Sequence, residues 1–223
     1  MPEATDALPA RLLLVEGVAG IGKSTVLDHL ARRHLAEAEE RRIRTLLHLT
    51  QAHTYGPLAP AEDAGTLTRA ACTAHLERVV GWLEWLAASV RGERQVKCFV
   101  LVDTLHLTHC LRPGVVRWSE VEGFDRRLAA AGCRLLLLDG EDETVRERCV
   151  AARADTPFIR DYALGRFGGS EAELARHFVR ERDAFRELFA ASSLPGLRLA
   201  AEAPVEETAA AAFDFWRGEE VPR

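Results

Sequence analysis

A glycine-rich stretch near the N-terminus has the residue types and the spacing of a phosphate-binding loop. Gly17 and Gly22 frame four residues, and Lys23 and Ser24 follow, which is the pattern G-x-x-x-x-G-K-[ST]. Glycines let the backbone turn its N–H groups inward onto a phosphate, and a helix that begins at the loop adds its positive N-terminal end. The stretch therefore predicts a site for ATP or GTP with Mg²⁺. The residues assigned to this nucleotide site are Gly17, Val18, Ala19, Gly20, Ile21, Gly22, Lys23, Ser24 and Thr25.

Two side chains of the loop have separate predicted tasks. Lys23 is expected to reach the β- and γ-phosphates and to act in catalysis, and the hydroxyl of Ser24 is expected to bind Mg²⁺. The motif by itself predicts binding of a nucleotide and names no reaction.

Asp103 is a second candidate, because it ends an apolar run at residues 98–103. A carboxylate at the end of a buried strand can hold Mg²⁺ or accept the proton of an attacking hydroxyl. The alternative is a cap of a helix or turn. We expect Asp103 to be a catalytic and metal-binding residue, with His53 and Glu16 as the other candidates for the proton acceptor.

Polar residues follow the second apolar run and suit a hydroxylated or amide-bearing substrate, although an ordinary loop would have a similar composition. His106 and His109 lie three residues apart, but the segment lacks the third ligand of a zinc site. Such histidines more often line a polar wall or lie hydrogen-bonded in the core, and one of them is also a candidate for a substrate contact. The predicted substrate contacts are Glu16, Gln51, His53, Tyr55 and His106.

Five short apolar runs alternate with helical patterns along the chain. The runs cover residues 11–17, 44–50, 98–104, 134–140 and 197–203. They are apolar on successive residues, which is typical of parallel strands covered on both faces. Apolar residues recur at helical spacing in four segments: after Gly22, over about residues 66–90, after Ser170 and after Pro204. The charged tract at 180–187 is interpreted as ion pairing on the exposed face of a helix.

This alternation predicts an α/β fold, in which helices form two layers around a doubly wound, five-stranded parallel sheet. Ligands of such sheets bind at the carboxyl ends of the strands. The phosphate loop and Asp103 both occur at such ends.

Composition limits the class of protein. The chain has 223 residues, 48% of them hydrophobic, and a net charge of −5, which argues against a nucleic-acid partner held by bulk charge. No apolar run approaches the roughly 20 residues of a membrane span, and the five cysteines form no C-x-x-C pair. We expect a cytoplasmic protein without a membrane partner. Trp82 and Trp85, three apart on a helix, mark core or the face of a homodimer.

Two stretches resemble the thymidylate kinase and deoxynucleoside kinase families of the nucleoside/nucleotide kinase-like group. "LLLVEGVAGIGKSTVLDHL" is similar to their first strand, phosphate loop and helix, and "LLLLDGEDETVRERCVAAR" to their fourth strand and arginine-bearing lid helix. The resemblance implies one P-loop kinase-like domain over residues 1–223 with a lid at about 141–169. It places Arg146, Arg148 and Arg153 in the lid, which Arg160 and Arg166 extend, and it implies catalytic roles for Arg146 and Arg153 at the transferring phosphoryl group.

The sequence departs from those families at two positions. Thr104 follows Asp103 where the families usually carry arginine, and no carboxylate follows the second strand until Glu62. We therefore expect an ATP-dependent kinase whose acceptor is a small molecule, with a hydroxyl or phosphate of a nucleoside-like or other metabolite as the target. The alternatives are a P-loop ATPase or nucleotide-dependent switch that acts on a protein partner, and a catalytically silent nucleotide binder.

Overall fold

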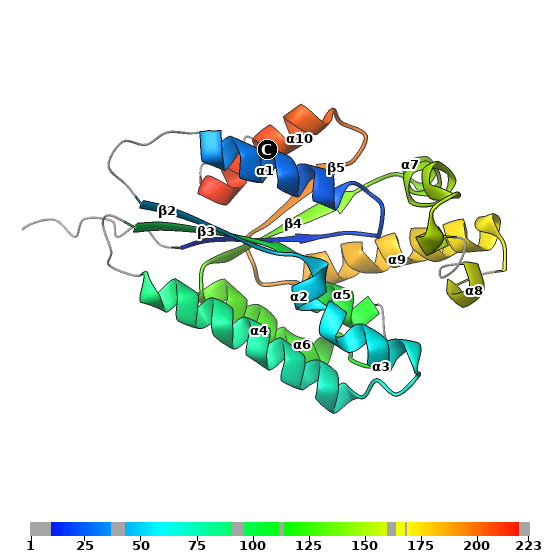
Figure 1. The fold of residues 1–223 in the computed structure, drawn as a ribbon, viewed down its shortest axis with the longest axis horizontal. Helices are drawn as coiled ribbons and strands as arrows, with labels where there is room; N and C mark the ends of the chain where they lie inside the picture. Colours follow the sequence, from blue (N-terminus) through cyan, green and yellow to red (C-terminus); the bar gives the residue numbers. More distant parts are fainter. Residues whose placement is uncertain are drawn as a thin grey trace, which may run out of the picture.

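The fold is built on a five-stranded sheet in which every neighbouring pair of strands is parallel (Figure 1). A computed structural model describes residues 10–36, 43–90, 96–111, 114–159, 164–167 and 169–218. The strand order is β2-β3-β1-β4-β5. The strands are β1 (Arg11–Glu16), β2 (Ile43–Leu49), β3 (Val96–Asp103), β4 (Cys133–Asp139) and β5 (Gly196–Ala200). The predicted α/β class and five-stranded parallel sheet are confirmed.

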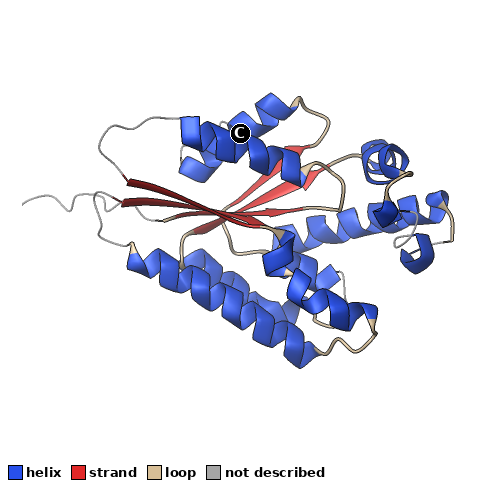
Figure 2. Ribbon diagram, viewed as in Figure 1, coloured by secondary structure: helices blue, strands red, loops and turns tan. Residues whose placement is uncertain are grey.

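Helices cover both faces of the sheet, as Figure 2 shows. On one face lie α1 (Lys23–Ala36) and α10 (Val205–Arg217), and on the other lie α4 (Arg69–Ser89) and α6 (Trp118–Ala130). The helix α9 (Glu171–Ala191) packs beside β4 and α5 (His106–Leu111). Among the described residues, no helix is both long enough and apolar enough to cross a membrane.

Short helices gather beyond the carboxyl ends of the strands. They are α2 (Gln51–Thr54), η1 (Gly56–Leu58), α3 (Ala59–Asp63), α7 (Asp142–Val145), η2 (Arg146–Val150), η3 (Ala151–Arg153) and α8 (Leu164–Phe167). The segment from α7 to η3 lies where the lid was predicted. These pieces and the phosphate loop surround the end of the sheet at which ligands of doubly wound folds bind.

The core lies around the central strand β1. Leu12, Leu13, Leu14 and Val15 are each exposed by 1% or less, and burial of each such side chain stabilises the fold by about 1.5–3 kcal/mol. The indole of Trp216 docks α10 onto this strand, since its Nε1–H donates to the carbonyl of Arg11 over 2.9 Å. This bond ties α10 to the first residue of β1.

The last strand, β5, is less covered than its sequence predicts. Its residues alternate between exposed and half-buried, whereas β4 is buried along nearly all of its length. The expectation that every strand is covered on both faces is therefore wrong for β5. The reason is its place at the edge of the sheet, where it pairs with β4 alone.

Candidate functional site

The loop between β1 and α1 depends on glycines in the left-handed backbone region. Gly17, Gly20 and Gly22 have φ values of +140°, +94° and +119°, which side chains rarely tolerate. A Cβ at Gly17 would lie 2.4 Å from the carbonyl oxygen of Leu138 in β4. The loop can therefore pass closely over the end of β4 only because glycine occupies this position.

Lys23 begins α1 and reaches back over the loop. Its Nζ donates to the carbonyls of Gly17 and Val18 over 2.6 Å and 3.0 Å. These bonds hold the ammonium group beside the inward turn of the loop, where a bound phosphate oxygen could replace a carbonyl as its partner.

A cavity of about 540 Å³ opens over the loop. The loop side is lined by Ala19, Gly20, Gly22, Lys23, Ser24 and Thr25, and the remaining lining residues are Gln51, Asp103, Arg153 and Phe158. Segments that are far apart in the sequence thus contribute an ammonium, a guanidinium, a hydroxyl and a carboxylate to one space. Such a set suits a polyphosphate with its metal ion.

Asp103 is placed by the end of β3 and by a strained turn after it. It pairs in register with Val15 of β1, and the side chain of Thr54 donates to the carbonyl of Asp103 over 2.9 Å. Thr104 has φ of +59°, the one positive value of a non-glycine residue in the described chain, and its N–H donates to Val15. The turn leaves Asp103 on the wall of the cavity and directs the chain into α5.

Arg153 of η3 approaches the phosphate loop from the segment that follows β4. Its guanidinium carbon lies 4.8 Å from the centre of the Phe158 ring, and Nη1 is buried with no hydrogen-bond partner among the described residues. A Cβ at Gly20 would lie 2.4 Å from that nitrogen. A donor of Arg153 therefore faces the top of the loop, beside the cavity.

The other arginines that were assigned to the predicted lid lie elsewhere. Arg146 is half-exposed and pairs with Asp142 and Glu143 at 3.4 Å. It does not line the cavity, so its position does not support its predicted catalytic role. Arg148 instead lines a smaller space of about 100 Å³ beside the loop, together with Thr25. Arg160 lies outside the described residues.

A second cavity, of about 410 Å³, adjoins the first. It is lined by Gln51, Ala52, Tyr55, Gly56, Ala59, Glu62, Asp63 and Phe158. Gln51 and Phe158 line both cavities. Of the predicted substrate contacts, Gln51 and Tyr55 lie here, and Arg166 of α8 approaches from outside, where it pairs with Glu62 and Asp63.

Three predicted substrate contacts, Glu16, His53 and His106, line neither cavity, and two of them are buried. Glu16 is buried and accepts hydrogen bonds from the N–H of Leu105 and the hydroxyl of Thr108, over 2.8 Å and 2.6 Å, so it ties β1 to the start of α5. His106 is also buried, and its Nε2 lies 2.9 Å from Asp125 of α6. Both side chains have partners in the core, so their positions do not support a contact with substrate.

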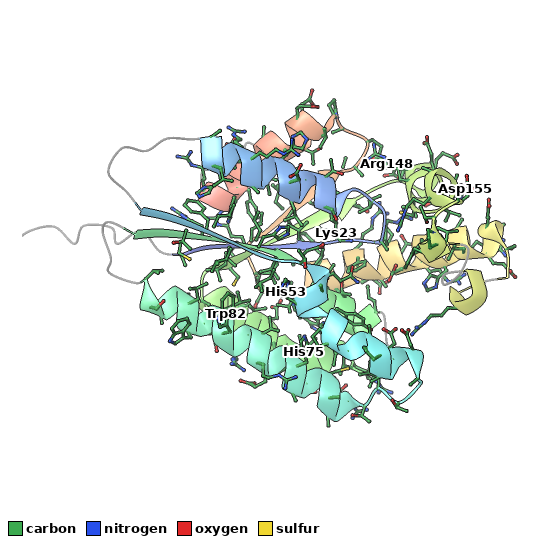
Figure 3. All side chains as sticks on the ribbon, in the orientation of Figure 1. Lys23, His53, His75, Trp82, Arg148 and Asp155 are labelled. Carbon is green, nitrogen blue, oxygen red and sulfur yellow. The ribbon has the colours of Figure 1, made fainter. Side chains whose placement is uncertain are left out.

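His53 and His109 take different environments. His53 is exposed on α2, with its Nδ1 3.1 Å from the hydroxyl of Thr50. His109 is buried, and its ring lies 5.4 Å from that of Tyr55, which lines the second cavity. Burial lowers the pKa of His109 to about 4. His109 is therefore a neutral, packed support of Tyr55. In Figure 3, Lys23, His53 and Arg148 all lie at the carboxyl end of the sheet.

Sequence reasoning missed Phe158, Glu62 and Asp63 as parts of the site. Phe158 had no signal at all, since a lone aromatic residue in a lid carries no spacing that marks it. Glu62 and Asp63 form an acidic pair in α3, and only the folding of 51–63 over the end of the sheet reveals that they line a cavity.

Comparison with known proteins supports the fold. No protein-family model matches the chain, and no curated protein matches it by sequence. Among solved structures, the chain is similar to YorR from Bacillus subtilis, crystallised in complex with phosphorylated GDP, with a TM-score of 0.58 and 11% identity over 92% of this chain and 94% of YorR. At this identity the likeness establishes the shared fold.

Proposed function

We propose that this protein is an ATP-dependent small-molecule kinase, which transfers the γ-phosphate to a hydroxyl or phosphate of a nucleoside-like or other small metabolite. The observation that carries the proposal is one cavity lined by Lys23, Arg153 and Asp103 that adjoins a second, less cationic cavity. The first has the groups that bind a triphosphate, and the second has room for an acceptor beside it.

A magnesium ion fits the residues present. Ser24 and Asp103 line the same cavity, and hydroxyl and carboxylate oxygens are ligands that Mg²⁺ prefers. When bound with ATP, Mg²⁺ would offset the negative charge of the β- and γ-phosphates.

The other roles in phosphoryl transfer belong to residues of the chain itself. Lys23 and the loop backbone hold the triphosphate, and Arg153 donates to the phosphoryl group as it leaves ADP. The acceptor oxygen forms the new bond to the γ-phosphorus, the bond from that phosphorus to the bridging oxygen breaks, and Asp103 takes the proton of an acceptor hydroxyl. Gln51 lies between the two cavities and orients the acceptor.

YorR was crystallised with phosphorylated GDP, which supports a nucleotide as a ligand of this fold, and we assign ATP the role of donor. We assign the space beside Arg148 to the base of the donor, since it adjoins Thr25 at the end of the phosphate loop. A cytoplasmic location suits an enzyme that consumes ATP. The homodimer stays a prediction, with Trp82 and Trp85 on the proposed face, exposed by 37% and 63%.

A screen of metabolites with radiolabelled ATP and Mg²⁺ tests the proposal, with nucleosides, nucleoside monophosphates, amino sugars and antibiotic-like alcohols as acceptors. Phosphoryl transfer to one acceptor class is expected, and Lys23→Ala should lower the rate by about a hundredfold or more. An undiminished rate in Lys23→Ala would sink the proposal. Fast ATP hydrolysis without any acceptor would favour the ATPase or switch instead.

A further inference from the structure

The second cavity, proposed to hold the acceptor (the acceptor cavity), differs in charge from the cavity over the phosphate loop, proposed to hold the nucleotide (the nucleotide cavity). Its ionisable lining residues among those described are Glu62 and Asp63, apart from the phenol of Tyr55. The cations Lys23 and Arg153 line the nucleotide cavity instead. An acceptor would therefore enter between carboxylates, with Asp103 at one end and the pair on α3 at the other.

Arg166 does not change the sign of this charge. It donates to Asp63 over 2.8 Å and to Glu62 over 2.5 Å, so its positive charge is shared between two carboxylates. A phosphate on the acceptor would have to compete with both of them for the guanidinium, and like charges in a partly desolvated pocket repel strongly. The arrangement therefore disfavours a phosphorylated acceptor.

Glu62 retains capacity to bind a ligand. Its side chain is only 7% exposed, and its two oxygens accept from the hydroxyl of Tyr55 and from Arg166. A carboxylate offers about four lone-pair sites, so further donors can bind there. Ala52, Ala59, Tyr55 and Phe158 provide apolar walls for the body of a ligand.

We propose that the acceptor is an alcohol that carries no phosphate group and that presents hydrogen-bond donors, either hydroxyl or ammonium, to Glu62 and Asp63. This inference rests on the proposed kinase function. The hydroxyl that is phosphorylated lies at the Asp103 end, and the apolar body of the acceptor packs between Tyr55 and Phe158.

Three probes with the same phenyl ring and chain length test the inference: phenylglycinol carries an ammonium and a hydroxyl, phenylglycol carries two hydroxyls, and phenethyl phosphate carries a phosphate. Each is titrated by NMR into the full chain saturated with ADP and Mg²⁺. Phenylglycinol or phenylglycol should bind about tenfold more tightly than phenethyl phosphate, which is the effect of one hydrogen bond to a charged group. The inference is overturned if phenethyl phosphate binds most tightly or if no probe binds.

Two variants identify the group that binds. If ammonium is the donor, Glu62→Gln should lower the affinity for phenylglycinol about tenfold and leave the affinity for phenylglycol unchanged. If hydroxyl is the donor, the variant should lower the affinity for both alcohols alike. Arg166→Gln keeps both carboxylates and should preserve or raise the affinity for the alcohols. Loss of phenethyl phosphate binding in Arg166→Gln, with strong binding in the wild type, would identify Arg166 as a phosphate site and contradict the inference. Circular dichroism checks that each variant is folded.

Titration of the same samples with ADP and Mg²⁺ separates this inference from the proposed function. If nucleotide fails to bind, both are rejected. If nucleotide binds and phenethyl phosphate is preferred, only the assignment of the acceptor is rejected.

Discussion

Arg153 and Arg146 lie in the same segment after β4, the predicted lid, yet their environments differ. Arg153 has a buried nitrogen beside Gly20, whereas Arg146 at the start of η2 is half-exposed and pairs with the exposed Asp142 and Glu143 of α7. We expect Arg153→Ala to lower kcat by about a hundredfold to a thousandfold, because the charge of the transferring group loses its donor. Arg146→Ala should stay within about twofold of wild type, since exposed pairs contribute little. Steady-state kinetics with the acceptor found by screening measures both, and equal losses would contradict the assignment.

His109 predicts how stability depends on pH. Burial lowers the pKa of its imidazole to about 4, against which the hydrogen bond to Leu105 works, and nearby His75 and His106 lower the pKa further. His109 of the unfolded chain takes up a proton near the ordinary pKa of about 6.5, whereas His109 of the folded chain stays neutral down to about pH 4. The free energy of unfolding therefore falls as the pH falls from about 6.5 to about 4, by about 3 kcal/mol in total. Urea unfolding at a series of pH values measures this slope.

His109→Leu should remove the slope between about pH 6.5 and 4. Asp125 provides an internal control in the same variant. Burial raises the pKa of its carboxyl, but hydrogen bonds from His106, Ser192 and Ser193 outweigh burial and lower the pKa to about 2. Its contribution is complete above the ordinary pKa of 3.8 and is lost as the pH falls toward 2, so acid should still destabilise the variant there. An unchanged slope above pH 4 would assign the effect to another group.

At the scale of elements, Gly17 of the phosphate loop and Gly81 of helix α4 occupy backbone positions with opposite requirements for glycine. Gly17→Ala should destabilise the fold by about 1–3 kcal/mol, because the new Cβ would collide with the carbonyl of Leu138 and the backbone has a positive φ. Gly81 lies within α4 and has open space around it, so Gly81→Ala should stabilise the protein by up to about 1 kcal/mol. Denaturant unfolding compares the two, and a shift in the same direction would refute the argument.

The periodic elements could be predicted from the sequence, because one pattern determines each of them. The strand runs and the helix after Gly22 carry their own hydrophobic period, and Ser170 caps α9 by accepting from the N–H of Glu173. The charged tract at 180–187 is not exposed throughout, so its interpretation as exposed ion pairing is wrong for Arg182. Arg182 is buried and donates to the carbonyl of Gly140 and to Asp142, each over 2.7 Å. Periodicity gives the face of a helix, but it does not give the distant backbone that a long side chain reaches.

The same limit decides how much of the site was predictable. Lys23, Gln51 and Asp103 follow from the rule that strand ends of a parallel sheet meet at one edge, and all three line the cavity over the phosphate loop. Glu16 and His106 obey the same rule but turn into the core, since each has partners on neighbouring elements. Position in a topology is readable from sequence, whereas the direction of a side chain depends on tertiary partners.

At the scale of the whole molecule, the order β2-β3-β1-β4-β5 brings the cavities together. The loop after β1, Asp103 at the end of β3 and the segment after β4 that carries Arg153 come from adjacent strands. The short helices after β2 then build the acceptor side next to them. A nucleotide would therefore link segments from much of the chain, and its binding should stabilise the molecule globally.

This linkage gives a prediction that needs no acceptor. A ligand that binds only the folded state adds about 2.7 kcal/mol at a free concentration about 100 times its dissociation constant, and a chain of this size gains roughly 2–4 °C in Tm per kcal/mol. ADP with Mg²⁺ should thus raise Tm by roughly 5–10 °C. Thermal unfolding with ADP or GDP, with and without a chelator of Mg²⁺, measures the effect and ranks the bases. Lys23→Ala should lose most of the rise while its Tm without ligand changes little. If neither nucleotide moves the Tm of the wild type, the cavity over the phosphate loop does not bind nucleoside diphosphates, because tight binding to the folded state alone cannot leave Tm unchanged.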